Sequence, residues 1–163
     1  MLLSDKYPFL TEYFTRALST NVRALPQSIL FYGNDADAQF TFATEIARLL
    51  NCTSDKSDNC ECLNCRWIRE NSHPAVLTIS RIDNKPDDDD SKTVISIKQS
   101  QMIKEALVSA SEFHRVFIFC DRDENGNIAG LNPLNFQAET ANSLLKIIEE
   151  PQPCLLYTSP SPR

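Results

Sequence analysis

The chain has 163 residues, of which 42% are hydrophobic and 23% are charged, and its net charge at pH 7 is -6. Such a chain is long enough for one domain with a sizeable buried core, and its composition is ordinary for a soluble globular protein. The acidic balance argues against a broad nucleic-acid-binding surface, which needs clustered lysine and arginine, but it allows membership of a complex whose other subunits contact DNA.

Helical and extended patterns alternate through the first half of the chain. Residues 7–18 carry apolar side chains at helical spacing, which predicts an amphipathic helix. The apolar run at 28–32 predicts a buried strand that ends in a glycine turn, and residues 38–50 predict a helix with a wide apolar face. A further helix is expected at 63–70 and a short apolar strand at 75–79.

The same alternation continues in the second half. A polar, acidic loop at 81–92 is followed by a predicted strand at 93–97 and a predicted helix at 98–109. The continuous apolar run at 115–120 is typical of a central parallel strand, and residues 139–150 predict a last helix. Strands that alternate with helices in this way predict an α/β fold with a mainly parallel sheet.

The tail at 154–163 departs from this pattern. Its sequence, rich in proline and serine towards its end, resembles the translated read-through of a sequencing adaptor, and a natural disordered tail is the alternative. We therefore exclude the tail from the fold and expect the domain to occupy residues 1–153, as a fragment of a longer native chain.

The chain lacks the marks of export and of membrane insertion. No apolar run approaches the roughly 20 residues that a membrane-spanning helix needs. The N-terminal residues 1–6 lack the charged-then-apolar order of a secretory signal. We therefore expect a cytoplasmic protein, in which thiols stay reduced and clustered cysteines indicate metal binding rather than disulfides.

Residues 33–40 have the frame of a phosphate-binding loop without the groups that hold a phosphate. A working loop reads Gly-x-x-x-x-Gly-Lys-Ser/Thr, with glycines that let backbone amides surround the phosphates, a lysine for charge and a hydroxyl for magnesium. Here the corresponding residues are Gly33, Ala38, Gln39 and Phe40, so that only the first glycine is kept. This pattern predicts a nucleotide-binding fold that does not use ATP.

The second nucleotide-handling element is also degenerate. It should be an apolar strand that ends in Asp-Glu, where the aspartate holds magnesium through water and the glutamate polarises an attacking water. The strand at 115–120 runs into Cys120, Asp121 and Arg122, and neither of the two registers supplies the Asp-Glu pair. We therefore assign no catalytic residue to this chain.

A cluster of cysteines follows the helix at 38–50. Cys52, Cys60, Cys62 and Cys65 have the spacing Cys-x7-Cys-x-Cys-x2-Cys, in which the middle step is tighter than the usual two-residue gap. Four thiolates fill the tetrahedral coordination of zinc and leave no position for water, so such a site is structural. The intervening residues are polar, so that metal binding would have to stabilise their folded form. The alternatives are four reduced, unliganded cysteines or a redox role.

Two other residues with metal-binding or reactive side chains receive simpler interpretations. His73 lies eight residues after Cys65 and could serve as a spare ligand, but a turn residue before the next strand is the better expectation. Cys120, which ends an apolar strand, is expected to be a small buried hydrophobic residue.

These features together resemble the clamp-loader branch of the AAA+ proteins, and within it the delta-prime subunits of bacterial DNA polymerase III. The resemblance covers residues 26–153. Besides the cysteines, it is carried in order by residues 30–33, 71–74, 95–103, 115–119 and 141–151. The last of these, Ala-Asn-Ser-Leu-Leu-Lys-Ile-Ile-Glu-Glu-Pro, is close to the family sequence Ala-Asn-Ala-Leu-Leu-Lys-x-Leu-Glu-Glu-Pro.

The resemblance implies a parallel-sheet AAA+ domain, related to the P-loop NTPases, with a zinc module at 52–65 inserted in it. In that family gamma/tau subunits hydrolyse ATP and delta-prime subunits commonly do not, so the altered phosphate loop favours delta-prime. The resemblance further implies a rigid stator that forms a hetero-pentameric ring with delta and gamma/tau in the polymerase holoenzyme. This ring loads the sliding clamp on primed DNA during replication. The family's arginine finger, lid and collar would lie beyond Pro153.

Two other functions stay open at this point. An active gamma/tau-like ATPase would have to bind nucleotide through this atypical loop, with Arg115 or Arg122 supplying positive charge. A zinc module that binds nucleic acid directly would need more cations than the segment at 52–65 offers.

Overall fold

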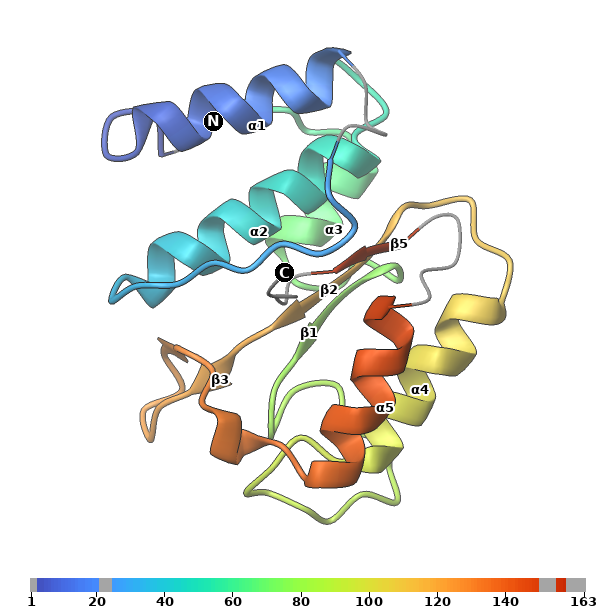
Figure 1. The fold of residues 1–163 in the computed structure, drawn as a ribbon. Coiled ribbons are helices and arrows are strands. Elements are labelled where there is room, and N and C mark those ends of the chain that lie inside the picture. Colours follow the sequence, from blue (N-terminus) through green and yellow to red (C-terminus); the bar gives the residue numbers. More distant parts are fainter. Residues whose placement is uncertain (1–2, 21–24, 150–154, 158–163) are drawn as a thin grey trace.

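A computed structural model of the protein describes residues 3–20, 25–149 and 155–157. At its centre is a parallel sheet of three strands, β1 (Val76–Ile79), β2 (Arg115–Phe119) and β5 (Leu155–Tyr157), in the order β1-β2-β5. Helices lie on both sides of this sheet (Figure 1). The prediction of an α/β fold with a parallel sheet is confirmed, and the strands expected at 75–79 and 115–120 are found as β1 and β2.

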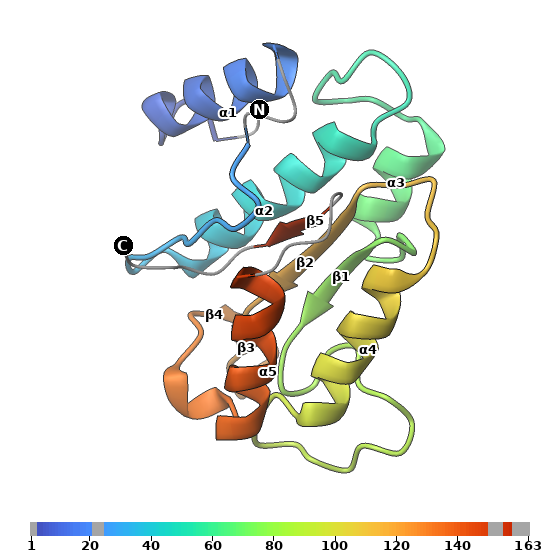
Figure 2. The same ribbon diagram turned by 45° about the vertical axis from the view of Figure 1, so that its right-hand side comes forward.

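The helices begin and end within a few residues of the predicted segments. They are α1 (Pro8–Thr20), α2 (Ala36–Asn51), α3 (Leu63–Arg69), α4 (Ile97–Val108) and α5 (Ala138–Glu149). Helices α2 and α3 cover one face of the sheet, with α1 packed outside α2, and α4 and α5 cover the other (Figure 2). In the part of the chain that the structure describes, no helix is both long and apolar enough to cross a membrane.

The core between the sheet and α2 uses alternate residues of the central strand. Val116 and Ile118 point into this core, because side chains along a strand alternate between its two faces. Phe14, Phe31 and Phe42 complete it, with ring centroids 6.0 to 6.2 Å apart. This packing fixes α2 on the sheet, and both candidate sites described below adjoin the ends of α2.

The core on the opposite face holds α4 and α5. Phe117 of β2 packs here with Ile103 and Ile147, and all three are buried. Gln99 of α4 is also fully buried, and its Nε2 donates to the carbonyl oxygens of Ser80 at 2.8 Å and Asp83 at 3.0 Å. This side chain therefore anchors the loop that follows β1.

The strand expected at 28–32 is not part of the sheet, and this prediction was wrong. Apart from a bridge position at Ser28, the segment has no strand structure. Leu30 and Tyr32 are 49% and 88% exposed, while Phe31 packs in the aromatic core. The segment forms one wall of a groove of about 410 Å³, whose other walls come from α2, β2 and residues 128–131. Apolar character alone does not supply the neighbouring backbone that a strand requires.

The strand expected at 93–97 was also wrong in its extent. Within this segment only Ile95 forms a bridge, which is parallel and pairs it with Phe136. Ser96 then starts α4 with a capping box, in which its side chain accepts from the Gln99 N–H while the Gln99 side chain accepts from the Ser96 N–H. The capping box therefore starts the helix at Ile97, within the segment that was predicted to be a strand.

A small hairpin after β2 was not predicted. Its strands β3 (Asp121–Arg122) and β4 (Ile128–Ala129) are antiparallel. In the connecting turn, Asp123 Oδ1 accepts from the backbone N–H groups of Asn125 at 2.9 Å and Asn127 at 2.8 Å. Gly126 has a φ of +83°, a conformation that favours glycine.

Part of the tail that we excluded from the fold belongs to the sheet. Strand β5 pairs in parallel with β2, with Arg115 opposite Leu155 and Phe117 opposite Tyr157. Our exclusion was therefore wrong for residues 155–157. The rest of 154–163, together with residues 150–153, lies outside the described residues.

Candidate functional site

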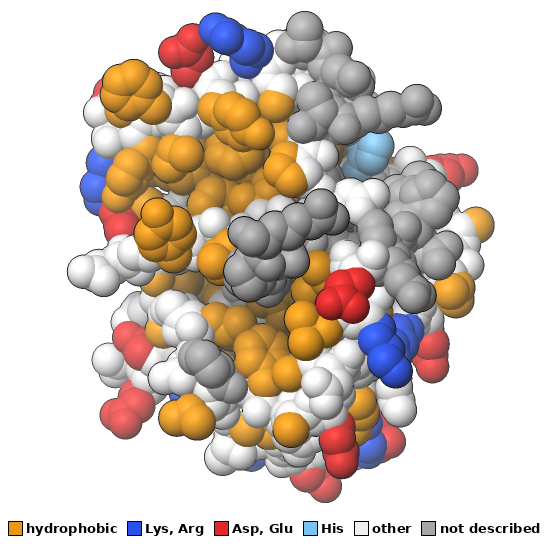
Figure 3. All heavy atoms as spheres, viewed as in Figure 1, with side chains coloured by type: hydrophobic (Ala, Val, Ile, Leu, Met, Phe, Trp, Pro, Cys, Tyr) orange, Lys and Arg blue, Asp and Glu red, His pale blue; other side chains and the backbone are white. Residues whose placement is uncertain are grey.

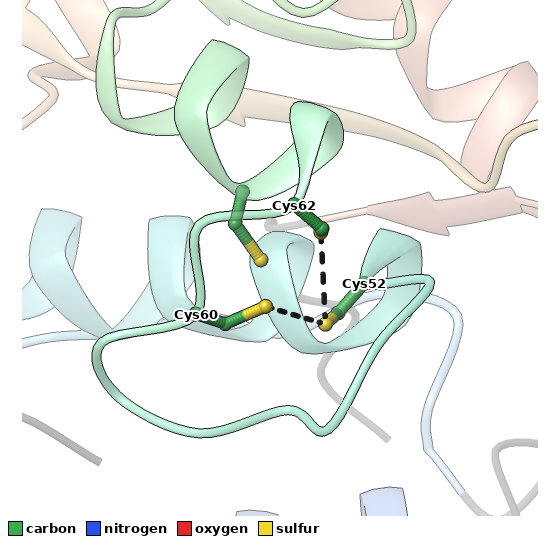
Figure 4. A group of neighbouring side chains, drawn as sticks. Cys52, Cys60 and Cys62 are labelled. Atoms are coloured by element: carbon green, nitrogen blue, oxygen red, sulfur yellow. Dashed lines mark hydrogen bonds between the residues drawn. The ribbon is translucent and has the colours of Figure 1, made fainter.

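The candidate metal centre lies between the C-terminal end of α2 and the start of α3. Cys52 caps α2, Cys60 lies in the following loop, Cys62 precedes α3 and Cys65 lies in its first turn. Their Sγ atoms all lie within 4.8 Å of one another. The Cys52 Sγ is 3.6 Å from that of Cys60 and 3.9 Å from that of Cys62 (Figure 4). The fold thus brings the four predicted cysteines together.

These distances suit a tetrahedral metal ion. Zinc–sulfur bonds of about 2.3 Å in a tetrahedron place the sulfur atoms about 3.8 Å apart, whereas a disulfide needs about 2.05 Å. The cysteines of the cluster are free, and two of them, Cys60 and Cys65, are buried. The tight step from Cys60 to Cys62 does not prevent convergence, because the Cys60 and Cys62 side chains both approach the Cys52 sulfur (Figure 4). The four cysteines can therefore hold a metal ion, and zinc fits them.

The thiols of the cluster differ in their acidity. Burial raises the pKa of Cys65 to about 12, and the neighbouring cysteines act in the same direction. Burial also acts to raise the pKa of Cys62, but hydrogen bonds from the backbone N–H groups of Cys65 and Thr53 lower it to about 6. Zinc binds thiolates, so coordination would deprotonate the buried Cys65 thiol against this tendency and release a proton.

Polar side chains tie the cysteine loop to the helices on either side. Asn64 Nδ2 donates to the Asn51 carbonyl oxygen at 2.8 Å, and Arg69 Nη2 donates to that of Asp58 at 2.9 Å. Arg48 is buried in α2, and its Nη1 lies 3.5 Å from the Cys65 Sγ. None of these three residues belongs to a metal-ligand motif, so their roles were not predicted from the sequence.

His73 lies apart from the cysteine cluster, in the turn before β1, as expected. Its ring contacts Trp67 and Phe113, with centroid distances of 6.1 and 4.9 Å. Its Nδ1 accepts from the Ala75 N–H at 3.1 Å, which places the proton of the neutral ring on Nε2. Nε2 has no hydrogen-bond partner among the described residues, and burial lowers the pKa of His73. We assign this histidine to packing rather than to metal binding.

The phosphate-loop frame at the other end of α2 is occupied by side chains of the protein. Gly33 has a φ of +126°, which favours glycine. The Gln39 Nε2, at the position of the missing lysine, donates to the Gly33 carbonyl oxygen at 3.2 Å. Ala38 is buried and Phe40 lines the groove described above. The loop is thus closed on itself by Gln39.

Asp35 caps the N-terminus of α2. Its Oδ1 accepts from the Ala38 N–H at 3.1 Å, and its Oδ2 accepts from Tyr7 Oη at 2.7 Å and forms an ion pair with Lys6. These hydrogen bonds, with that of Lys6 the largest, lower the pKa of Asp35 to about 2. An aspartate before a helix is a recognisable capping signal, which our sequence analysis missed. The contact with residues 6 and 7 has no local signal.

The two charged residues that follow β2 and Cys120, Asp121 and Arg122, both pair with side chains from other segments of the chain. Asp121 Oδ1 accepts from Arg81 Nε at 2.9 Å, and its Oδ2 accepts from Asn135 Nδ2 at 3.1 Å. Arg122 Nε donates to Asp83 Oδ2 at 2.6 Å. Cys120 is buried, and burial raises its pKa to about 12. Cys120, Asp121 and Arg122 therefore lie together after β2. The two charged side chains connect this segment to the loop after β1, through Arg81 and Asp83, and to Asn135.

Hydrophobic side chains gather on the face of the molecule that carries α1 and α2, with charged side chains mostly around its margin (Figure 3). The groove beside residues 29–33 is lined largely by apolar residues of this kind. Its lining offers no cationic side chain among the described residues. A nucleotide phosphate would find no charged partner there.

Comparison with protein families decides which family this is. Residues 7–159 match the family described as DNA polymerase III, delta subunit. The chain belongs to this family. Membership in the DNA polymerase III delta family indicates a role in clamp loading during DNA replication, as part of the clamp-loader complex. The small parallel sheet with helices on both faces fits an AAA+-like domain of this family. A search of curated proteins gave no match.

Proposed function

We propose that this DNA polymerase III delta-family protein is a delta-prime-type subunit, a non-catalytic stator of the clamp loader. It assembles with delta and gamma/tau in a hetero-pentamer that loads the sliding clamp on primed DNA. The subunit works in the cytoplasm, and its neighbours hydrolyse the ATP. Its own phosphate-loop frame acts as a structural turn.

The observation that carries this proposal is the position of the Asp35 carboxylate. The N-terminus of a helix attracts anions because its first N–H groups are unpaired and carry partial positive charge. In α2 the carboxylate already accepts the Ala38 N–H, and Lys6 neutralises it. A phosphate at the N-terminus of α2 would have to displace the Asp35 carboxylate from the Ala38 N–H. It would then lie beside the negative charge of that carboxylate.

The ion pairs after β2 support the same conclusion. Magnesium bound to a nucleotide needs a carboxylate that is free to hold water around the ion. Asp121 is already engaged by Arg81 and Asn135, and Arg122 by Asp83. Magnesium binding here would require the loss of these contacts.

We further propose that Cys52, Cys60, Cys62 and Cys65 bind one structural zinc ion. The sulfur atoms are close enough for a single ion, and all of the tetrahedral positions would be filled by thiolates. The zinc would join the end of α2 to the start of α3 and would take no part in a reaction.

Calorimetric titration with Mg-ATP tests the assignment. We expect no heat of binding from the full chain at nucleotide concentrations that saturate a working phosphate loop. A gamma/tau subunit assayed in parallel provides the positive control. Micromolar binding of Mg-ATP by this chain would overturn the non-catalytic assignment in favour of a gamma/tau-like ATPase with an atypical loop.

A further inference from the structure

Arg48 is a buried cation that points at the cysteine cluster from α2. Its side chain is only 2% exposed, and it lies one helical turn before Cys52. Its Nη1 is 2.9 Å from the carbonyl oxygen of Ser57, in the cysteine loop, and 3.5 Å from the Sγ of Cys65. A guanidinium group is seldom buried unless partners compensate its charge, so these contacts require an explanation.

Glu45 fixes the direction of this guanidinium. The carboxylate oxygen Oε1 accepts from Arg48 Nε at 2.8 Å and also contacts Nη2. The edge of the guanidinium formed by Nε and Nη2 is therefore taken up by the carboxylate. Nη1 is left to face the cysteine loop and the sulfur, and the planar, rigid fork holds it in that direction.

We propose that Arg48 is a positioning residue of the metal centre, which donates a hydrogen bond to the Cys65 thiolate while Glu45 orients it. This inference rests on the proposed zinc site. Four thiolates around a divalent cation leave an excess of negative charge, and an N–H donor reduces the charge on the sulfur that it contacts. The same guanidinium holds the Ser57 carbonyl and so fixes the path of the loop between Cys52 and Cys60.

Arg69 offers a matched comparison. It also donates to a carbonyl of the cysteine loop, that of Asp58, and it lies 3.7 Å from Glu61. Its side chain is 36% exposed, and these two contacts are both to oxygen atoms rather than to sulfur. Replacing Arg69 therefore tests the effect of a loop contact alone, and replacing Arg48 adds the effect on the sulfur.

The experiment measures the zinc affinity of the full chain and the absorption spectrum of its cobalt-substituted form. The double variant Glu45→Leu with Arg48→Leu removes both buried charges of the pair, so that Glu45 is not left as a buried, unpaired carboxylate. We expect it to bind zinc about 10- to 100-fold more weakly than the parent chain, the usual loss for a group behind a metal ligand. We also expect its sulfur-to-cobalt charge-transfer band to shift. Arg69→Leu should leave that band in place and change zinc affinity by less than about threefold.

The possible results separate this inference from the proposed zinc site. A parent chain that binds neither zinc nor cobalt overturns the zinc site itself. A parent chain that binds zinc, with a double variant of the same affinity and the same cobalt spectrum, overturns the role of Arg48 alone. If the double variant does not fold, Arg48→Lys decides, since it keeps the charge and loses the fork. An unchanged cobalt band in Arg48→Lys would then contradict the role proposed for the guanidinium.

Discussion

The two ends of α2 adjoin two candidate sites of opposite kind. At the C-terminal end, Cys52 and three further cysteines converge with their sulfur atoms available to a metal ion. At the N-terminal end, the Asp35 carboxylate occupies the place of an anion and Lys6 compensates it. The two ends of one helix thus differ in which groups are already paired within the protein: the anion-binding end has an internal partner, whereas the four sulfur atoms face one another. The experiments below test this contrast.

The largest effect is expected from losing the metal. Cys65→Ser should abolish the binding of about one zinc ion per chain and lower the thermal midpoint, because metal binding contributes directly to folding. Elemental analysis and thermal unfolding with and without a chelator measure both effects. Cys120→Ser is the control, since Cys120 is a buried thiol outside the cluster. A parent chain that folds without zinc, or a Cys65→Ser variant with the thermal midpoint of the parent chain, would contradict the prediction.

Breaking the buried pair of Arg48 and Glu45 should destabilise the protein much more than breaking the exposed pair of Lys6 and Asp35. Arg48→Ala leaves Glu45 buried without its partner and should lower the free energy of unfolding by about 3–5 kcal/mol. Lys6→Ala removes a solvent-exposed partner of Asp35, and its effect should be much smaller. Denaturant unfolding of both variants makes the comparison. Equal losses would show that the two ends do not differ in this respect.

Repairing the phosphate loop should fail unless Asp35 is also removed. The triple variant Ala38→Gly, Gln39→Lys, Phe40→Thr restores the residues that the motif requires. We expect no Mg-ATP binding by this variant, because the carboxylate still occupies the helix N-terminus. Adding Asp35→Gly should allow measurable binding. Calorimetry measures each step, and micromolar binding by the triple variant would remove Asp35 from the explanation.

The stability of the protein should depend on pH through His73. Burial lowers the pKa of His73 below its ordinary value of 6.5, so the native state binds the proton less readily than the unfolded state. The contribution of neutral His73 to the free energy of unfolding is therefore fully present above pH 6.5. It decreases as the pH falls below that value, by at most about 1.4 kcal/mol per pH unit.

Denaturant unfolding between pH 7.5 and 5.5 measures this slope, and His73→Gln should reduce it. The exposed His114 supplies the comparison variant, His114→Gln, in which His73 is intact. A slope that survives in His73→Gln would assign the pH dependence to other groups, the cysteines among them.

The smallest effect concerns Asp35 at acid pH. Its pKa is lowered from 3.8 to about 2, so its contribution is present above 3.8 and is lost as the pH falls towards 2. Asp35→Ala should therefore be slightly less stable than the parent chain at neutral pH and should converge with it at pH 2. Asp37→Ala, which removes an exposed carboxylate two residues later, is the control. Thermal unfolding at both pH values checks the convergence.

Most of the fold could be predicted from local patterns. The helices and the strands β1 and β2 follow from apolar spacing and from end signals that act within a few residues. The four cysteines could also be predicted as one set, because reduced, closely spaced thiols have few other uses. Prediction failed at residues 28–32 and 93–97, because an apolar run by itself does not distinguish a strand from a buried loop.

Other features depended on residues far apart in the chain. The pairing of β5 with β2, the contact of Lys6 and Tyr7 with Asp35, and the ion pairs after β2 all join distant segments. Such contacts form only when the packed core brings backbone and side chains together, and local composition does not encode them. The sequence alone established that the phosphate loop lacks its ligands. Tertiary structure decided what stands in their place, because the first N–H groups of a helix have no partner within the helix and must find one elsewhere.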